Sequence, residues 1–255
     1  MNALYFIVVG VLVGILTGLT GSSGVLIVVP AYLYAGFTFK QAVGSSLLID
    51  VVTTISVVYS FFTSHKVDVR KASVMALSST VGAQTGAILS TRVQDVYLEL
   101  AFTVFTSVMA YVSFRRAFGK SNLHETRGRD EKRWKYVPLS LFSFLIGNVA
   151  STIGASGGIM FLSVLMLLFS MDVKELIGTA TLAMFFTALS GSLAFLGLGL
   201  LPLGEALTTA LTSLVVGYFV SRQTLKLRPS LIYGALGLTF VLTTVSTVLR
   251  LLQGA

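Results

Sequence analysis

Apolar positions run along this chain in ten long blocks, and charged residues gather almost entirely between the blocks. The blocks cover residues 3–20, 24–37, 42–63, 71–90, 96–114, 137–152, 158–170, 176–198, 204–221 and 230–250. A helix of about 20 apolar residues, rising 1.5 Å per residue, crosses a hydrocarbon core of about 30 Å. The pattern therefore predicts an all-α integral membrane protein with eight to ten membrane segments.

Composition supports this prediction and narrows the chemistry. Of the 255 residues, 55% are hydrophobic and 11% are charged, whereas a soluble domain carries about 25% charged residues. The start of the chain has neither a basic region nor an A-x-A-like cleavage site, so we expect the first segment to be retained. Cysteine is absent, which excludes disulfides and thiolate chemistry. His65 and His124 have no ligand partner at helical spacing, so we expect no metal and no cofactor.

A basic stretch divides the blocks into five and five. The net charge of the chain is +8, and the stretch from Arg115 to Lys135 contributes most of it. Basic loops between apolar spans mark the cytoplasmic side, and this one lacks the interleaved aromatic residues of a nucleic-acid site. We therefore predict a first membrane repeat (1–116), a basic cytoplasmic linker (117–136), a second membrane repeat (137–255) and no nucleic-acid partner.

The two halves resemble each other. Gly14-x3-Gly18-x2-Gly21-Ser22-Ser23-Gly24 recurs half a chain later as Gly147-x3-Ser151-x2-Gly154-Ala155-Ser156-Gly157, and two further motifs recur at nearly the same offset. The Lys and Arg residues of loops 64–71 and 222–229 are all cytoplasmic if residues 137–170 make two passes or a re-entrant hairpin. Each half then has five segments, which inverts the second copy, as in secondary transporters. Both termini would be periplasmic. Four crossings per half, with parallel repeats, is the alternative.

Glycine clusters interrupt one apolar run in each half. They are Thr20, Gly21, Ser22, Ser23 and Gly24 in the first half, and Gly154, Ala155, Ser156, Gly157 and Gly158 in the second. Glycine weakens a helix by about 1 kcal/mol relative to alanine, so each cluster predicts a break. A broken helix exposes N–H groups, which lipid tolerates only at a cavity and which attract anions. We predict that the two breaks face each other and form an anion site to which their hydroxyls donate. Simple close packing of helices is the alternative.

Asp50 is the only charged residue between Gln41 and Ser64. A carboxylate inside a span costs at least about 2.5 kcal/mol unless it is protonated or paired. Ser46, Thr53 and Thr54 share its helix face, so we expect this face to point into the protein. We assign Asp50 to proton coupling; the alternative is a neutral acid with a structural role.

Five further polar residues within the blocks are candidate substrate contacts, although such residues more often form hydrogen bonds between helices. They are Ser45, Ser46, Gln84, Asn148 and Thr181. No nucleophile, base and orienting group occur together, and no phosphate-loop or zinc-helix motif is present. The sequence therefore predicts that the protein is not an enzyme.

The glycine clusters, the segment Lys40-Gln41-Ala42-Val43-Gly44-Ser45-Ser46-Leu47 and the Gly82-x3-Gly86 helix, repeated weakly after a basic linker, resemble the sulfite exporter TauE/SafE family, also called toluene-sulfonate uptake permeases. The resemblance covers nearly the whole chain. It implies a multi-pass secondary transporter of the bacterial inner membrane for sulfite, sulfoacetate or another sulfonate. Two departures are the Ser22-Ser23 pair, where many relatives carry further glycine, and Asp50, where a neutral polar residue is expected.

We therefore expect a transporter of a small sulfur-containing anion that works by alternating access and couples to protons through Asp50. The partners that we expect are the small anionic substrate and the lipid bilayer, and the sequence leaves a homodimer open. An anion channel and a non-transporting membrane scaffold are the alternative functions.

Overall fold

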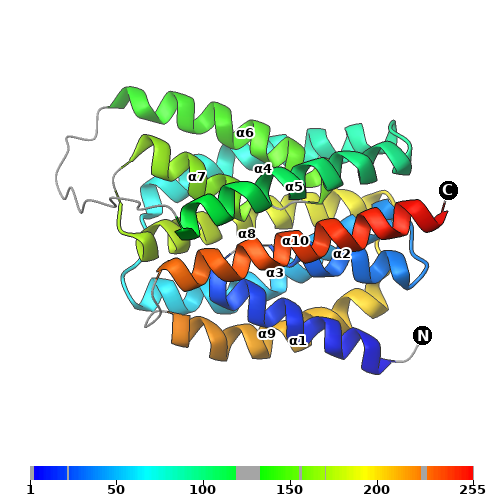
Figure 1. Ribbon diagram of the computed structural model, residues 1–255. Helices are drawn as coiled ribbons and strands as arrows, with labels where there is room; N and C mark the ends of the chain where they lie inside the picture. Colours follow the sequence, from blue (N-terminus) through cyan, green and yellow to red (C-terminus); the bar gives the residue numbers. More distant parts are fainter. Residues whose placement is uncertain are drawn as a thin grey trace.

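The computed structural model describes residues 3–21, 23–118, 133–154, 157–169, 171–224 and 229–254. These ranges form ten α-helices and one short 3₁₀ helix, without strands (Figure 1). The α-helices are α1 (Ala3–Thr20), α2 (Val25–Tyr34), α3 (Phe39–Thr63), α4 (Val69–Thr91), α5 (Asp95–Phe118), α6 (Tyr136–Ile153), α7 (Gly158–Leu168), α8 (Val173–Gly197), α9 (Leu203–Thr224) and α10 (Pro229–Gly254), and the 3₁₀ helix η1 covers Arg133–Lys135.

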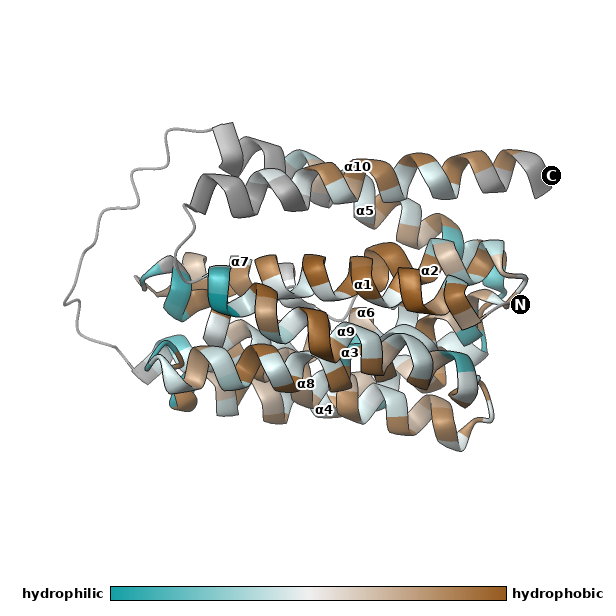
Figure 2. Ribbon diagram, turned by 90° about the horizontal axis from the view of Figure 1, so that it is seen from below, coloured by the Kyte–Doolittle hydropathy of each residue, from teal (hydrophilic) through white to brown (hydrophobic). Residues whose placement is uncertain are grey.

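The described helices carry apolar surface in the way that a membrane protein does. Five of them are long and apolar enough to cross a bilayer, at Ala3–Thr20, Phe39–Thr63, Tyr136–Ile153, Lys174–Gly197 and Leu203–Thr224. Large apolar side chains such as Leu4, Leu77 and Leu167 point outward, which suits lipid rather than water. Figure 2 shows hydrophobic residues along the middle of the bundle and hydrophilic ones at its two ends. The predicted all-α integral membrane fold is confirmed.

Both halves contain a broken helix at the predicted place. In the first half α1 ends at Thr20 and α2 begins at Val25; in the second, α6 ends at Ile153 and α7 begins at Gly158. Helix α2 has 10 residues and α7 has 11, so each covers only about half of a 30 Å hydrocarbon core. In Figure 1, α1 and α6 run in opposite directions. Each break therefore lies inside the bundle, not at its surface ends.

Each packed pair of helices has a counterpart in which both helices are replaced by the corresponding helices of the other half. Helix α1 packs on α9, as α6 packs on α4; α3 packs on α9, as α8 packs on α4; and α3 packs on α8. Small residues allow this approach, since a Cβ atom on Gly14 would lie 2.8 Å from the Ser213 carbonyl oxygen, and one on Gly147 would overlap the Ser79 carbonyl oxygen. These two glycines, which precede the glycine clusters, therefore allow the helices to pack in close contact. The inverted duplication itself stays a prediction.

The bundle has two distinct ends. At one, which we call the linker end, α5 ends and α6 begins, and the α3–α4 loop and the α7–α8 loop lie beside them (Figure 1). The start of α1, the end of α10 and the start of α3 lie at the other, which we call the opposite end.

Candidate functional site

Asp50 holds the first helix break. Its side chain is fully buried on α3, and its carboxylate accepts hydrogen bonds from the Ser23 hydroxyl (2.5 Å) and from the backbone N–H of Gly24 (2.8 Å). The Val25 N–H donates to the Ser23 hydroxyl oxygen at 3.0 Å. The prediction that this break offers bare N–H groups is therefore wrong for Gly24 and Val25, because the chain supplies its own acceptors. A carboxylate fits here because a helix N-terminus carries about half a positive charge.

Two glycines shape the first break for different reasons. Gly21 has a φ of +62°, a conformation that costs other residues about 1 kcal/mol or more, and its N–H closes α1 by donating to the Thr17 carbonyl at 2.8 Å. Gly24 has an ordinary backbone, but a Cβ atom there would overlap Val13 and lie 3.3 Å from a carboxylate oxygen of Asp50. One glycine makes the turn, and the other makes room for the carboxylate.

The second break also begins at a glycine with positive φ, but no carboxylate contacts its described residues. Gly154 and Gly157 have φ values of +79° and +81°, and the Gly157 carbonyl accepts from the N–H of Phe161 at 2.7 Å to start α7. The position that corresponds to Asp50 is Met184, which is fully buried on α8. Ala155 and Ser156 of this break, like Ser22 of the first, lie outside the described residues.

Each break packs against the long central helix of the other half. A Cβ atom on Gly21 would lie 2.5 Å from Ile177 Cγ2. The Thr181 hydroxyl lies 3.1 Å from the Gly21 carbonyl oxygen and 2.7 Å from the Ile177 carbonyl oxygen of its own helix, and it can donate to either. In the second half, a Cβ atom on Gly154 would lie 2.9 Å from Val43 Cγ2, and the Ser46 hydroxyl makes a long contact of 3.5 Å with the Gly154 carbonyl.

The Cβ atom that a side chain at Gly154 would add also lies 3.1 Å from Cγ2 of Val25, the first residue of α2. Because α3 and α8 pack on each other, the two breaks and the start of α2 meet near the centre of the bundle.

Several candidate residues have partners elsewhere. The Thr20 and Ser45 hydroxyls donate to carbonyls of their own helices. Gln84 Nε2 donates to the carbonyl and the hydroxyl of Ser190 at 2.8 and 2.9 Å, which ties α4 to α8. Asn148 Nδ2 donates to the Thr85 hydroxyl at 2.9 Å, which ties α6 to α4. Hydrogen bonds between helices were the alternative for Gln84 and Asn148, and substrate contact by any of these residues stays a prediction.

Three fully buried hydroxyls, those of Thr17, Ser143 and Ser151, have no hydrogen-bond partner among the described residues. Thr17 and Ser151 lie beside the breaks and were not among the predicted site residues, whereas Ser143 lies further back on α6. Buried polar groups without partners are rare and indicate a water or ligand. Thr17 lies one helical turn before Gly21, and Ser151 lies one turn before Gly154. That spacing, a hydroxyl one turn ahead of a break glycine, was a signal in the sequence.

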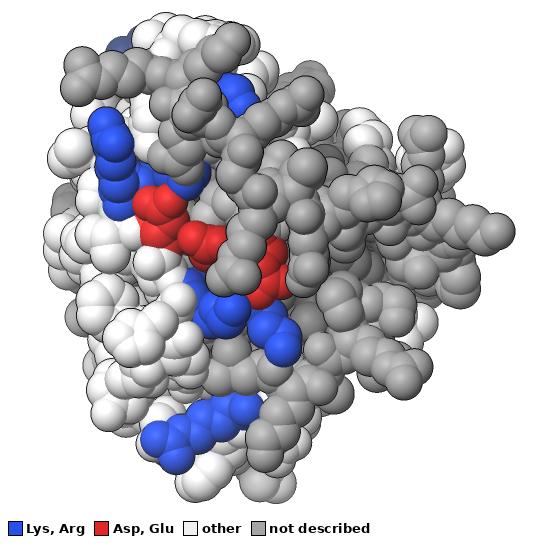
Figure 3. Space-filling model, turned by 90° about the vertical axis from the view of Figure 1, so that its left-hand side faces the viewer, with Lys and Arg blue, Asp and Glu red and all other residues white. Residues whose placement is uncertain are grey.

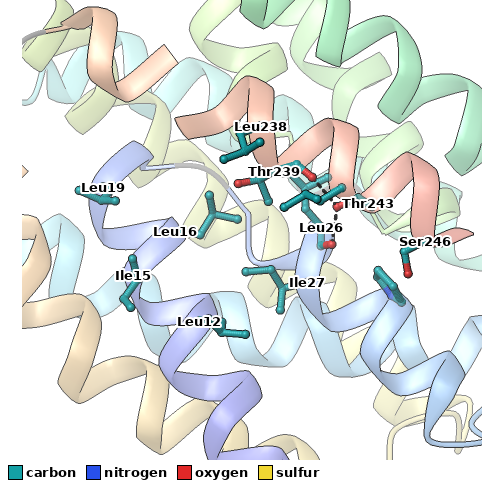
Figure 4. A pocket seen from close by; sticks show the side chains of 12 residues that line it. Leu12, Ile15, Leu16, Leu19, Leu26, Ile27, Leu238, Thr239, Thr243 and Ser246 are labelled. Atoms are coloured by element: carbon teal, nitrogen blue, oxygen red, sulfur yellow. Dashed lines mark hydrogen bonds between the residues drawn. The ribbon is translucent and has the colours of Figure 1, made fainter. Parts of the chain in front are cut away.

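A cavity among the described residues lies elsewhere and has a different character. A groove of about 420 Å³ lies between α1, α2 and α10 (Figure 4). Leucine and isoleucine side chains line most of it, and the Thr243 hydroxyl is bound to the Leu26 carbonyl at 2.6 Å. Leu12, Leu238 and Leu242 on its rim are about half exposed. The groove offers no charged group to an anion, so we do not assign the candidate site to it.

An α-helical membrane bundle whose two broken helices meet at its centre is the architecture of a membrane transport protein. The comparisons with known proteins agree. The family model for the sulfite exporter TauE/SafE matches residues 6–247, and the chain belongs to this family. It is a multi-pass membrane transporter, and its family is one of transporters rather than enzymes.

The "Probable membrane transporter protein YunE" of Bacillus subtilis (strain 168) is 22% identical over 214 residues, which cover 76% of this chain and 78% of the relative. No solved structure matches the chain.

Proposed function

We propose that this transporter moves a small sulfur-containing anion, such as sulfite, sulfoacetate or another sulfonate, by alternating access, and that Asp50 couples this movement to protons. The observation that carries the proposal is the buried Asp50 carboxylate on the N-terminus of α2, where it accepts from Ser23 and Gly24. A site that binds an internal carboxylate has the donors that a substrate anion needs.

Asp50 and a substrate anion compete for the same donors. Two anions a few ångströms apart in a medium of low dielectric repel strongly, so the site holds either the ionised Asp50 or the substrate. Protonation removes the charge of Asp50 and frees the Gly24 N–H for a sulfonate or sulfite oxygen. One proton then travels with each anion, and this exchange is the coupling step.

Two buried hydroxyls, one beside each break, supply donors that need no displacement. The Ser151 hydroxyl is buried without a partner among the described residues, as is that of Thr17. Sulfite and sulfonate oxygens are acceptors only, so two hydroxyl donors near the packed breaks match their chemistry. The name of the family supports the sulfur-containing class of anion.

The test is a flux assay on the purified full-length protein in proteoliposomes, with radiolabelled sulfite, sulfoacetate and a larger sulfonate, with and without a pH gradient. We expect saturable flux of at least one of these anions, accelerated when the side from which the anion is taken up is acidic. Unsaturable conductance in planar bilayers would instead favour a channel. No flux of any of the three anions would contradict the proposal.

The orientation that we propose follows the positive charges. Lys66, Arg70 and Lys71 lie at the linker end together with η1, and basic loops stay cytoplasmic. We therefore place the linker end on the cytoplasmic side of a bacterial inner membrane and both termini in the periplasm. Reporter fusions to the C-terminus test this, and a fusion active only in the cytoplasm would reverse the orientation.

A further inference from the structure

The α3–α4 loop (residues 64–68) binds the other half of the protein at the linker end. The backbone carbonyl of Lys66 packs so closely on Gly178 of α8 that a Cβ atom on Gly178 would overlap it. The N–H of Asp68 donates to the Thr179 hydroxyl at 2.9 Å, and Lys66 Nζ lies 3.2 Å from a carboxylate oxygen of Asp172, directly before α8. Three different contacts therefore tie this loop to the start of α8.

The equivalent joint at the opposite end is weaker. There the α8–α9 loop meets the start of α3, and a Cβ atom on Gly44 would lie 3.0 Å from the Leu200 carbonyl oxygen. The position that corresponds to Lys66 is Leu200, which has no charge, and Pro202 replaces Asp68 and has no N–H to donate. Thr38 replaces Asp172, and its side chain caps its own helix. The two joints share a plan, but among the described residues an ion pair and a hydrogen bond cross only the joint at the linker end.

Neighbouring contacts hold the α7–α8 loop against the first half and against η1. Lys71 on α4 lies 4.9 Å from the ring centroid of Phe169, and Lys135 lies 5.6 Å from the same ring. Lys135 also donates to the Leu168 carbonyl at 2.8 Å. Figure 3 shows acidic side chains beside basic ones on this end of the molecule.

We propose that residues 64–68, closed on Gly178, Thr179 and Asp172, form a latch that holds the transporter shut at the linker end. This inference rests on the proposed function, because alternating access requires the two ends to open in turn. The Lys66–Asp172 pair is roughly half exposed, and an exposed pair alone biases such an equilibrium by no more than about fivefold. The latch therefore depends on the ion pair, the hydrogen bond and the close Gly178 contact together.

The first experiment measures opening without measuring flux. The chain contains no cysteine, so spin labels on Ser64→Cys and Leu167→Cys report the separation of the two halves at the linker end by pulsed electron resonance. We expect one short distance in the parent and a longer second population, at least about fivefold enriched, in Lys66→Asp. Adding Asp172→Lys should restore the short distance. Lys40→Asp is the matched control, because Lys40 pairs with Asp95 within the first half at the opposite end.

The second experiment locks the latch. A Lys66→Cys/Asp172→Cys variant joined by a short bifunctional thiol reagent should lose at least about tenfold of its anion flux and regain it on reduction. The matched Lys40→Cys/Asp95→Cys variant should keep its flux within about twofold when joined. An unchanged distance in Lys66→Asp, or normal flux in the joined Lys66–Asp172 variant, would overturn the latch. Absence of flux in the unmodified protein would overturn the proposed function instead, while the distance measurement would still decide the latch.

Discussion

The two helix breaks begin with the same glycine turn but differ in charge. Both turn at a glycine with positive φ, and both pack on the central helix of the other half. The first carries a buried carboxylate on its N–H groups, whereas the second has Met184 at the corresponding position. Each has a buried hydroxyl one turn earlier, Thr17 or Ser151, without a partner among the described residues. In the proposed mechanism the carboxylate of the first break therefore controls when an anion binds, and the two hydroxyls add donors.

The largest effect is expected from filling the turns of the two breaks. Gly21→Ala would place a methyl group 2.5 Å from Ile177 Cγ2, and Gly154→Ala would place one 2.9 Å from Val43 Cγ2. Overpacking costs about 1–3 kcal/mol and the positive φ about 1–2 kcal/mol more, so we expect either variant to lose stability by about this sum and to lose most of its flux.

Gly36→Ala is the control for this prediction, because Gly36 has a φ of +88° and nothing within 4 Å of its Cβ position. The comparison of Gly36→Ala with the other two variants separates the effect of the positive φ from the effect of close packing at the breaks. If all three variants lost flux equally, close contact between the breaks would not matter for transport.

The next effect distinguishes the first break from the second. Asp50→Asn keeps an acceptor for the Gly24 N–H but cannot carry a proton, so we expect flux that no longer responds to a pH gradient. Asp50→Ala leaves the donors of Ser23 and Gly24 without an acceptor and should cost about 1–3 kcal/mol of stability. Flux under imposed pH gradients and thermal unfolding in detergent measure the two effects. A normal pH response in Asp50→Asn would exclude proton coupling through this carboxylate.

A smaller effect contrasts two serine hydroxyls. Ser23→Ala removes a donor to Asp50 and should lower stability by about 1–2 kcal/mol. Ser151→Ala removes a hydroxyl that has no partner among the described residues, so stability should stay the same or rise, while the Michaelis constant for the anion should increase about tenfold. A loss of stability without a change in the Michaelis constant would make Ser151 a structural residue only.

The smallest effect concerns the hydroxyls that cross between the halves. Thr181→Val removes a hydroxyl shared between the Gly21 carbonyl (3.1 Å) and the Ile177 carbonyl (2.7 Å) and should cost about 1 kcal/mol. Ser46→Ala removes only a 3.5 Å contact with Gly154 and should cost less than about 0.5 kcal/mol. Thermal unfolding of both variants checks this order. The reverse order would show that the second break depends more on the opposite half than the first does.

Much of the fold was predictable because it depends on local properties of the chain. Long apolar blocks require helices in a bilayer, and clusters of glycine end them, so the boundaries near Thr20 and Ile153 followed from composition alone. The buried polar face around Asp50 also followed from helical spacing. The polar residues Gln84 and Asn148 were harder, because spacing on one helix does not say which neighbour they will reach.

The sequence by itself determined that this protein spans a membrane with helices, that one helix in each half is broken, and that a carboxylate lies inside a span. Tertiary structure decided that this carboxylate caps the α2 N-terminus and that each break packs on a helix of the other half. It also decided that Lys66 pairs with Asp172 across the two halves at the linker end. The physical reason is the range of the interactions. Hydropathy and helix propensity act within a few neighbouring residues, whereas the N–H groups of a break take whichever acceptor the packing of distant helices brings within 3 Å.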